Sequence, residues 1–508
     1  MKKAAWHENL IPLFFAIFPV LSLALENYEF IKFSSILRSL LISIIVVYSF
    51  YLLFYLIFKD PRKSGILSGI LIFILITYGN VYLFLENQLG QAVRHRYLIG
   101  AYVIFLIIVG AYVILKVKNA KELSLAFFTG GMVIVLYLLV SIGFIEYEEY
   151  RADVTSEEKG ELFVSNTFEV ENSNLPDIYL IVLDSYTRSD VLQKVYDYDN
   201  SDFIDNLEEL GFRVAKCAQS NYPFTSFSMT SLFEMDYIHN IYNDYDDFED
   251  VVFPPLNRTA TYQILSNNDY SLATFQNNFI EHFDILDDIK FSKEDGLLGS
   301  INEFEEMVVN TSILRILITT GGIFPDSWVR GFKDNISLTY YRESKYALET
   351  LPSLADQDEQ LFVYVHLLVN HSPYVFMPDG SFRTSEPSPR IGYRDTVEFI
   401  DNVLPDILGE IIDNSEVPPI IILMADHGAR LAEASSIYDR LSVLMAIYLQ
   451  GEPIDEFYDQ ITPANVFRII FNYLFDANIE LIEDKSFEIW NLSQAGNFDK
   501  EVLAPCNP

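Results

Sequence analysis

The sequence predicts a multi-pass α-helical membrane domain at the N-terminus, followed by an α/β domain with a mostly parallel central sheet. Two observations lead to this prediction. The N-terminal part of the 508-residue chain holds five apolar segments with few charges, each near the ~20 residues that cross a bilayer core. The rest alternates short apolar runs with helical patterns, which is typical of helices that cover both faces of a parallel sheet.

The membrane domain is expected to occupy residues 1–145. Its five transmembrane helices are predicted at residues 9–25, 36–58, 65–85, 97–115 and 125–145. Eight basic residues flank these helices on one side, namely Lys2, Lys3, Lys59, Arg62, Lys63, Lys116, Lys118 and Lys121, and four on the other, namely Lys32, Arg38, Arg94 and Arg96. Basic loops stay in the cytoplasm, so the N-terminus is expected inside and, after five spans, everything beyond residue 146 outside.

The outer part is strongly acidic. The whole chain has a formal charge of -37, and residues 151–508 contain 22 basic and 62 acidic side chains. Such a surface repels nucleic acid and anionic lipid, so the positive partner that we expect is a cation. The composition does not predict an oligomeric state.

Residues 146–176 are polar and acidic and are predicted to be a linker, after which the outer domain spans 177–508. Strands are expected at 177–184, 211–220, 270–276, 360–369 and 443–450 and in the apolar run 418–425, and helices at 203–210 and 396–412. Both cysteines, Cys217 and Cys506, lie in this part. An oxidising compartment would permit a disulfide between them, although the sequence does not establish that they meet.

Two of the predicted strands end in chemically active side chains. DIYLIVLD ends in Asp184, and PPIIILM leads through Ala425 into Asp426 and His427. If these strands are parallel neighbours, the three side chains converge at one edge of the sheet, where α/β proteins bind ligands. Two carboxylates and an imidazole near a core suit one divalent cation, and the histidine favours Zn²⁺ or Mn²⁺ over Mg²⁺ or Ca²⁺.

A fourth ligand and a nucleophile are both expected in SNYPFTSFSMTSLF. Pro223 precedes a stretch with apolar residues at helical spacing, so Thr225 should lie at a helix N-terminus, where anions are stabilised. Metal coordination lowers the pKa of a hydroxyl and makes it a better nucleophile. Thr225 is therefore the predicted nucleophile, with Ser226 as the alternative.

These motifs resemble the alkaline phosphatase superfamily, specifically its sulfatase-like membrane branch, which includes lipoteichoic acid synthases and phosphoethanolamine transferases. The resemblance rests on Asp184 at a strand end, a threonine about forty residues later, NHSPYVF, and a late strand closing with DHG. It implies that Asp184, Thr225, Asp426 and His427 hold the metal. It also implies that His371 of NHSPYVF contacts the transferred group or protonates the leaving group.

Three further residues could line the pocket and bind substrate, namely Arg188, Asn221 and His366. A histidine within a strand, such as His366, is more often a core residue with satisfied hydrogen bonds. The sequence AQSNY follows Cys217, so the C-x-P-x-R setting in which sulfatases form formylglycine is absent. The few outer histidines favour one metal ion over two.

The predicted activity is phosphoryl-type transfer through a covalent threonine intermediate, which water or an alcohol then resolves. Membrane anchoring and the resemblance imply a lipid-linked or cell-envelope ester as substrate and the bacterial cytoplasmic membrane as location, with the catalytic domain outside. Two alternatives stay open. One is hydrolysis of a sulfuric ester or phosphodiester at the same site, and the other is a non-catalytic scaffold for envelope assembly.

Overall fold

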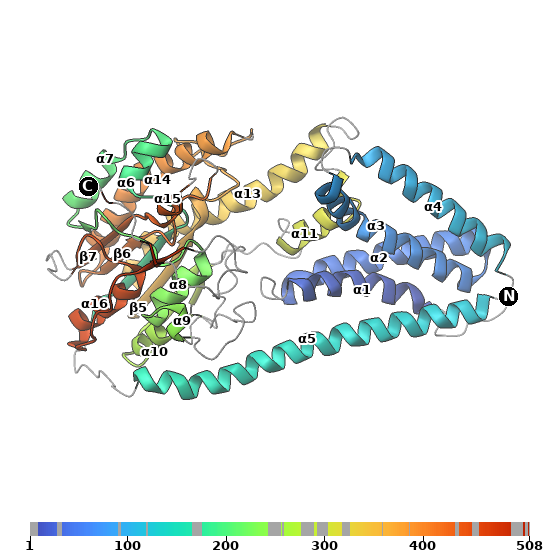
Figure 1. Cartoon of the computed structure of the whole chain (residues 1–508), viewed down its shortest axis with the longest axis horizontal. Helices are drawn as coiled ribbons and strands as arrows, with labels where there is room; N and C mark the ends of the chain where they lie inside the picture. The colour runs from blue at the N-terminus through green and yellow to red at the C-terminus, as the bar shows by residue number, and fades with distance from the viewer. Residues whose placement is uncertain are drawn as a thin grey trace. The chain divides into compact units, whose positions relative to one another are not determined.

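The computed structural model describes residues 9–27, 33–89, 93–117, 120–164, 175–241, 256, 259–275, 289–291, 303–316, 326–357, 359–385, 387–431, 436–449, 457–488, 501–502 and 506. The chain folds into two compact units. The first, here the helical unit, comprises Met1–Asp153 and Asp295–Ile336, and the second, the outer unit, comprises Val154–Glu294 and Ser337–Pro508 (Figure 1).

The helical unit begins with five consecutive helices. They are α1 (Ile11–Glu26), α2 (Phe33–Phe58), α3 (Pro61–Leu89), α4 (His95–Leu115) and α5 (Ala120–Val164). Within the described residues, α2 to α5 are long and apolar enough to cross a membrane. The helix α1 has 16 residues, or about 24 Å, which is short of a ~30 Å bilayer core. A fifth span at residues 9–25 therefore stays a prediction.

Most of the segment predicted as a linker, residues 146–176, is helical. The helix α5 continues without a break to Val164. The acidic stretch after the last apolar segment thus extends the preceding helix up to that residue.

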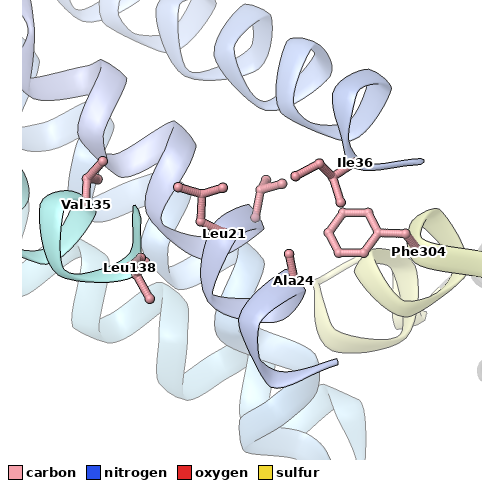
Figure 2. Packing of buried hydrophobic residues seen from close by; sticks show 7 residues of the cluster. Leu21, Ala24, Ile36, Val135, Leu138 and Phe304 are labelled. Atoms are coloured by element: carbon pink, nitrogen blue, oxygen red, sulfur yellow. The ribbon is translucent and has the colours of Figure 1, made fainter. Parts of the chain in front are cut away.

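The chain returns to the helical unit long after α5. Helix α11 (Glu303–Thr311) inserts the ring of Phe304, which is 1% exposed, among side chains of α1, α2 and α5. Figure 2 shows this ring beside Ile36 and Ala24. A little further on, the backbone N–H of Ile313 donates a hydrogen bond to the carbonyl oxygen of Leu75 in α3 at 2.7 Å. The predicted boundary at residue 146 does not anticipate this return.

Two local features explain why α11 packs here. Glu305 and Arg38 of α2 form an ion pair through two hydrogen bonds. On α3, a Cβ atom added to Gly79 would lie 2.3 Å from the carbonyl oxygen of Asn310. A side chain on residue 79 would therefore push the returning backbone away, and glycine permits the close approach.

We expect charge reversal at Arg38→Glu to release the returning segment, because Glu305 would then face a second carboxylate in a mostly buried place. Breaking such a pair destabilises the packing by about 2–4 kcal/mol. The measurement is maleimide labelling of Ser312→Cys, since Ser312 is only 4% exposed and both native cysteines are paired. Labelling should be slow in the parent and fast with Arg38→Glu.

The matched control adds Glu305→Arg to Arg38→Glu, which restores opposite charges. Equal labelling in the single and the double reversal would contradict the role of the ion pair.

The outer unit is built on a seven-stranded, mostly parallel sheet. Its strands are β1 (Ile178–Leu183), β2 (Arg213–Val214), β3 (Ser271–Phe275), β4 (Ile289–Phe291), β5 (Leu361–Leu367), β6 (Ile420–Met424) and β7 (Met445–Leu449), in the order β2-β7-β6-β1-β5-β3-β4. The central strand β1 runs parallel to both β5 and β6, and β7 and β2 add an antiparallel edge. All residues of β1, β5, β6 and β7 are buried, because helices cover both faces.

Helices lie on both sides of this sheet. They are α6 (Ser189–Val191), α7 (Ser201–Glu209), α8 (Thr225–Glu234), α9 (Ile238–Ile241), α10 (Ala260–Ser266), α14 (Pro389–Asn414), α15 (Ile437–Leu441), α16 (Pro463–Phe475) and, from Ser337 on, α13 (Asp326–Thr350), with short 3-10 or π-helical segments at Leu192–Tyr196, Leu351–Asp356 and Leu368–Asn370. A small ribbon pairs β8 (Ser486–Phe487) with β9 (Glu501–Val502). Figure 1 shows α14 on one side of the strands and α8 with α16 on the other.

The predicted strands and helices are confirmed with one refinement. Strand β2 covers only two residues of the predicted 211–220, because the chain then turns towards the site through Cys217. Cys217 and Cys506 form a disulfide, with their Cα atoms 5.4 Å apart. The bond joins the far C-terminus to the segment that precedes α8.

Stability of the outer unit should fall as the pH rises, and Glu234 in α8 is one cause. Burial raises its pKa to about 7 despite a hydrogen bond from the backbone N–H of Ala260. A carboxyl group with a raised pKa stabilises the fold when it is protonated, and this contribution disappears between about pH 4.5 and 7. Glu234→Gln should therefore raise the melting temperature at pH 8 and leave it nearly unchanged at pH 4.5.

The measurement is the melting temperature of the full chain in detergent at both pH values, with the exposed Glu209→Gln as control. Loss of stability in Glu234→Gln at pH 8 would contradict the expectation.

Candidate metal and active site

The candidate site lies at the carboxyl ends of three adjacent parallel strands. Asp184 follows β1, and Asp426 follows β6, which lies on one side of β1. His366 is the next-to-last residue of β5, on the other side of β1, and pairs in register with Val182. These three residues form a buried group whose ligand atoms all lie within 4.8 Å of one another.

Strand geometry determines where His366 points. Side chains two apart on a strand share one face of a sheet, and on β5 that face carries Phe362, Tyr364 and His366. Phe362 packs on Phe467 of α16, and Tyr364 packs on Phe233 of α8. His366 therefore lies on the same face as α8, the helix that begins with Thr225.

The contacts of His366 make it more than a core residue. Its Nε2 atom lies 3.5 Å from Oδ2 of Asp184 and 4.0 Å from Oδ2 of Asp426. Its Nδ1 atom is hydrogen-bonded to the hydroxyl of Tyr364 at 3.0 Å. The sequence alone suggests substrate binding for His366, whereas its position suits a metal ligand. The two-residue alternation of Phe362, Tyr364 and His366 is the local pattern that puts this side chain on the face of α8.

The geometry of His427 leaves one ring nitrogen directed at the site. Its Nδ1 atom lies 2.9 Å from the carbonyl oxygen of Gly428. A carbonyl only accepts hydrogen bonds, so Nδ1 carries the proton and Nε2 keeps its lone pair. That Nε2 atom lies 3.4 Å from Oγ1 of Thr225 and 3.4 Å from Oδ2 of Asp426. Burial is the main cause that lowers the pKa of His427, which favours the neutral ring that metals require.

Thr225 is the first residue of α8, as predicted. Phe224 precedes it in an extended conformation, and the helix continues to Glu234. Thr225 is half-buried, and so is Ser226. The predicted nucleophile thus combines partial access with the partial positive charge of a helix N-terminus.

Ser185 holds the two carboxylates in place, although its sequence carries no signal for this role. Its hydroxyl donates a hydrogen bond to Oδ1 of Asp184 at 2.6 Å, and its backbone N–H donates to Oδ1 of Asp426 at 3.2 Å. Its φ of 64° lies in the left-handed region, which costs a residue with a Cβ about 1 kcal/mol. The strained backbone turns both donors towards the carboxylates.

Replacing Ser185 should weaken metal binding without removing a ligand. Partners that orient ligands typically contribute 10–100-fold in metal affinity, so both Ser185→Ala and Ser185→Gly should bind the metal about tenfold or more weakly. Only Ser185→Gly relieves the backbone strain, and it should be the more stable of the two variants. Titration with Co²⁺, followed by absorbance and by thermal melting, separates these effects. Unchanged Co²⁺ affinity in both variants would exclude the orienting role.

The third residue of the Asp-His-Gly motif, Gly428, lies so close to a neighbouring backbone that a side chain would not fit there. A Cβ atom on Gly428 would lie 2.4 Å from the carbonyl oxygen of Asp439 and 2.9 Å from that of Ser442. The backbone N–H of Gly428 also donates to the carbonyl oxygen of Arg440 at 2.7 Å. The segment around α15 therefore lies directly against the turn that presents His427.

The donor set fits a divalent cation. Oδ2 of Asp426, a fully buried residue, has no hydrogen-bond partner among the described residues, and such an orphan anionic oxygen is costly unless a cation is beside it. Donors that bind Zn²⁺ at 2.0–2.2 Å in a tetrahedron lie about 3.3–3.6 Å apart. Three of the donor separations given above fall at 3.4–3.5 Å.

Electrostatics keep the first carboxylate ionised. Burial alone raises the pKa of Asp184, but the contact with His366 and the interaction with His371 outweigh it, and the pKa lies below its ordinary value. An ionised carboxylate is the form that binds a cation. The same interaction places His371 within electrostatic range of the site.

The three remaining predicted site residues are His371, which is half-buried, and Arg188 and Asn221, which are buried. His371 follows the turn after β5, is half-buried, and contacts the carbonyl oxygen of Ser372 through Nδ1 at 2.7 Å. Arg188 is buried and bonded to Asp190 and to the carbonyl oxygen of Ala218. Asn221 is buried as well and bonds backbone groups of residues 464 and 485. We give Arg188 and Asn221 no catalytic role.

Comparisons with known proteins agree with this architecture. Residues 176–468, more than half of the chain, match the family model described as Sulfatase. A comparison with curated protein sequences gives no match.

Similar solved structures include the C-terminal periplasmic domain of EcEptC from Escherichia coli, with 12% identity, a TM-score of 0.39, and coverage of 64% of this chain and 92% of that one. Another is the lipoteichoic acid synthase LtaP from Listeria monocytogenes, with 13% identity, a TM-score of 0.38, and coverage of 64% and 79%. A third is the soluble domain of lipooligosaccharide phosphoethanolamine transferase A from Neisseria meningitidis, with 14% identity, a TM-score of 0.35, and coverage of 61% and 90%.

Proposed function

Because the chain belongs to the sulfatase family, we propose that it is a membrane-anchored, metal-dependent enzyme that transfers or hydrolyses a phosphoryl-type group. The substrate is a lipid-linked or cell-envelope ester outside the cytoplasmic membrane. One observation carries the proposal. Two carboxylates and an imidazole lie together at the ends of adjacent strands, and the second imidazole, that of His427, lies 3.4 Å both from one of these carboxylates and from the hydroxyl of Thr225 at a helix N-terminus.

The cation would be held by Asp184, Thr225, Asp426 and His427, with His366 as a further donor. Oxygen and imidazole donors together suit Zn²⁺ or Mn²⁺ better than Mg²⁺ or Ca²⁺. When bound, the cation lowers the pKa of the threonine hydroxyl and neutralises charge on the ester oxygens. Neutral His427 and ionised Asp184 are already in the protonation states that this binding requires.

Thr225 supplies the nucleophile. Its hydroxyl releases a proton to solvent, Oγ1 attacks phosphorus, the bond from phosphorus to the leaving oxygen breaks, and a phosphate ester of threonine forms. The N-terminus of α8 favours the negative charge that develops on the attacked group. Water or an acceptor alcohol then attacks phosphorus and releases Thr225, which gives hydrolysis in the first case and transfer in the second.

His371 protonates the leaving oxygen. Its Nδ1 contacts the carbonyl oxygen of Ser372, so Nδ1 carries a proton and donates it to that oxygen, which leaves Nε2 for the leaving group. His371 follows the turn after β5, the strand that carries His366. General acid catalysis of this kind typically contributes 10²–10⁴-fold to a rate.

The location follows from the membrane helices and from the charges that flank them. Four helices can cross a bilayer, and the basic residues favour a cytoplasmic N-terminus. An outside location for the outer unit therefore also requires α1 as the predicted fifth span. The Cys217–Cys506 disulfide suits an oxidising compartment outside the cytoplasm. An enzyme held at that surface meets lipid-linked donors and growing envelope polymers.

A sulfuric-ester hydrolase would use the same site, because a sulfuryl group has a similar charge distribution. The family assignment favours this second candidate, while the absence of the C-x-P-x-R setting in the sequence counts against it.

The test is intact-mass and metal analysis of the full chain in detergent after incubation with bis(p-nitrophenyl) phosphate. The full chain is needed because residues 295–336 belong to the helical unit. One bound transition metal together with an adduct of one p-nitrophenyl phosphoryl group, which is what remains of the diester after one p-nitrophenolate leaves, supports the proposal. A metal without an adduct, combined with turnover of p-nitrophenyl sulfate, would favour the sulfuric-ester candidate. Absence of metal, adduct and turnover would favour a non-catalytic scaffold.

A further inference from the structure

We propose that Arg430 determines donor specificity by binding a second anionic group of the donor, next to the ester that Thr225 attacks. The inference rests on the proposed function. It predicts that donors with a phosphate or carboxylate close to the scissile ester are preferred to neutral ones.

Packing holds Arg430 next to the nucleophile. Its guanidinium carbon lies 5.4 Å from the centre of the Phe224 ring, a distance at which cation and ring attract each other. Phe224 directly precedes Thr225 and caps α8. Arg430 is also three residues beyond His427, whose turn is held by the close contacts of Gly428. Arg430 thus lies between two parts of the candidate site, namely Phe224, which precedes the proposed nucleophile, and the turn that carries His427.

The charge of Arg430 is available to a ligand. Its side chain is exposed. Its guanidinium lies over the Phe224 ring, and no carboxylate of the described residues forms an ion pair with it. This is unusual in a region where residues 151–508 carry 62 acidic and 22 basic side chains. A cation without a carboxylate partner among the described residues, beside the N-terminus of α8, is suited to an anionic substrate.

A second guanidinium strengthens the positive potential here. Burial is the main cause that lowers the pKa of Arg440, and the nearby charge of Arg430 adds to it. Arg430 therefore lies within electrostatic range of both Arg440 and His427. Two positive charges within electrostatic range of each other favour the binding of an anion nearby.

Arginine has the right chemistry for this role. Its planar guanidinium can donate two parallel hydrogen bonds to a carboxylate or a phosphate, and it stays charged at any physiological pH. The contact with the Phe224 ring does not use the N–H groups as donors to a carboxylate, so they can serve a ligand. A neutral or purely apolar group at this position would gain no such bonds.

The experiment compares two inhibitors of the Mn²⁺-loaded or Zn²⁺-loaded full chain by calorimetry. Phenylphosphonate tests the metal site alone, and 4-carboxyphenylphosphonate adds a rigid second anion that cannot chelate the same ion. We expect the parent to bind the carboxylated inhibitor about tenfold more tightly. Arg430→Gln should lose that preference and bind phenylphosphonate almost as before, and Arg430→Lys should keep part of the preference. Lys345→Gln, which removes a charge on α13, should behave like the parent.

The possible outcomes separate this inference from the proposed function. Failure of both phosphonates to bind the parent would overturn the metal and anion site itself, and this inference with it. Phosphonate binding with no preference in the parent, or with the same preference in Arg430→Gln, would overturn the role of Arg430 alone. In enzyme assays the same variant should raise KM for the carboxylated ester about tenfold and leave kcat within about twofold.

Discussion

Thr225→Ala should abolish formation of the covalent adduct and lower turnover of an activated phosphodiester by at least about 10⁴-fold. The hydroxyl of Thr225 is the proposed attacking atom, and loss of a nucleophile leaves only the residual effect of substrate binding and charge stabilisation. Metal binding should weaken but persist, because Asp184, Asp426 and His427 remain. The measurement is intact mass after mixing, together with steady-state rates and metal content of the same sample.

Two variants serve as controls for this result. Thr225→Ser keeps a hydroxyl at the start of α8 and should restore the adduct and part of the rate. Ser226→Ala removes the neighbouring hydroxyl, also half-buried, and should leave both unchanged. An adduct that survives in Thr225→Ala and disappears in Ser226→Ala would assign the nucleophile to Ser226 instead.

Asp426→Asn should cause the largest loss of metal affinity, on the order of 10³-fold or more. The residue is fully buried, and its Oδ2 atom has no hydrogen-bond partner in the described structure. An amide in its place contributes no charge, so the cation would lose half of the negative charge that the two carboxylates supply. Without the cation, turnover should fall to background. Calorimetric metal titration and elemental analysis measure the first effect directly.

Asp401→Asn is the matched control, because Asp401 is also a buried carboxyl group near the site. Burial raises its pKa to about 7, and the hydroxyls of Tyr186 and Tyr198 donate hydrogen bonds to it. Since it has these partners and belongs to no ligand group, its amide variant should bind the metal like the parent. Equal metal loss in both variants would indicate general unfolding rather than loss of a ligand.

Local patterns were sufficient for part of the candidate site. Two apolar runs that end in Asp184 and in Asp426-His427 can be recognised as buried strands without any tertiary information. Their parallel pairing is confirmed by the register of β1 and β6. The position of Thr225 at the start of α8 follows from Pro223 and the helical spacing after it. In each case residues that are close in the sequence are sufficient for the prediction.

Other parts of the site depend on contacts between residues far apart in the sequence. His366 becomes a donor because β5 is the other neighbour of β1, and no pattern within 360–369 determines strand order. Ser185 acts through a left-handed backbone conformation that is imposed by the turn around it. Arg430 matters because its guanidinium stacks on Phe224, about 200 residues earlier.

The sequence by itself determined that apolar helices precede an acidic α/β domain, since hydrophobic length and alternation are local properties of the chain. The tertiary structure alone decided that α11 returns to the helical unit, where Phe304 is buried among α1, α2 and α5. It also decided that Cys217 meets Cys506. The physical reason is that long-range packing depends on which surfaces are complementary in three dimensions. The sequence of a short amphipathic helix such as α11 does not specify which other helices it packs against.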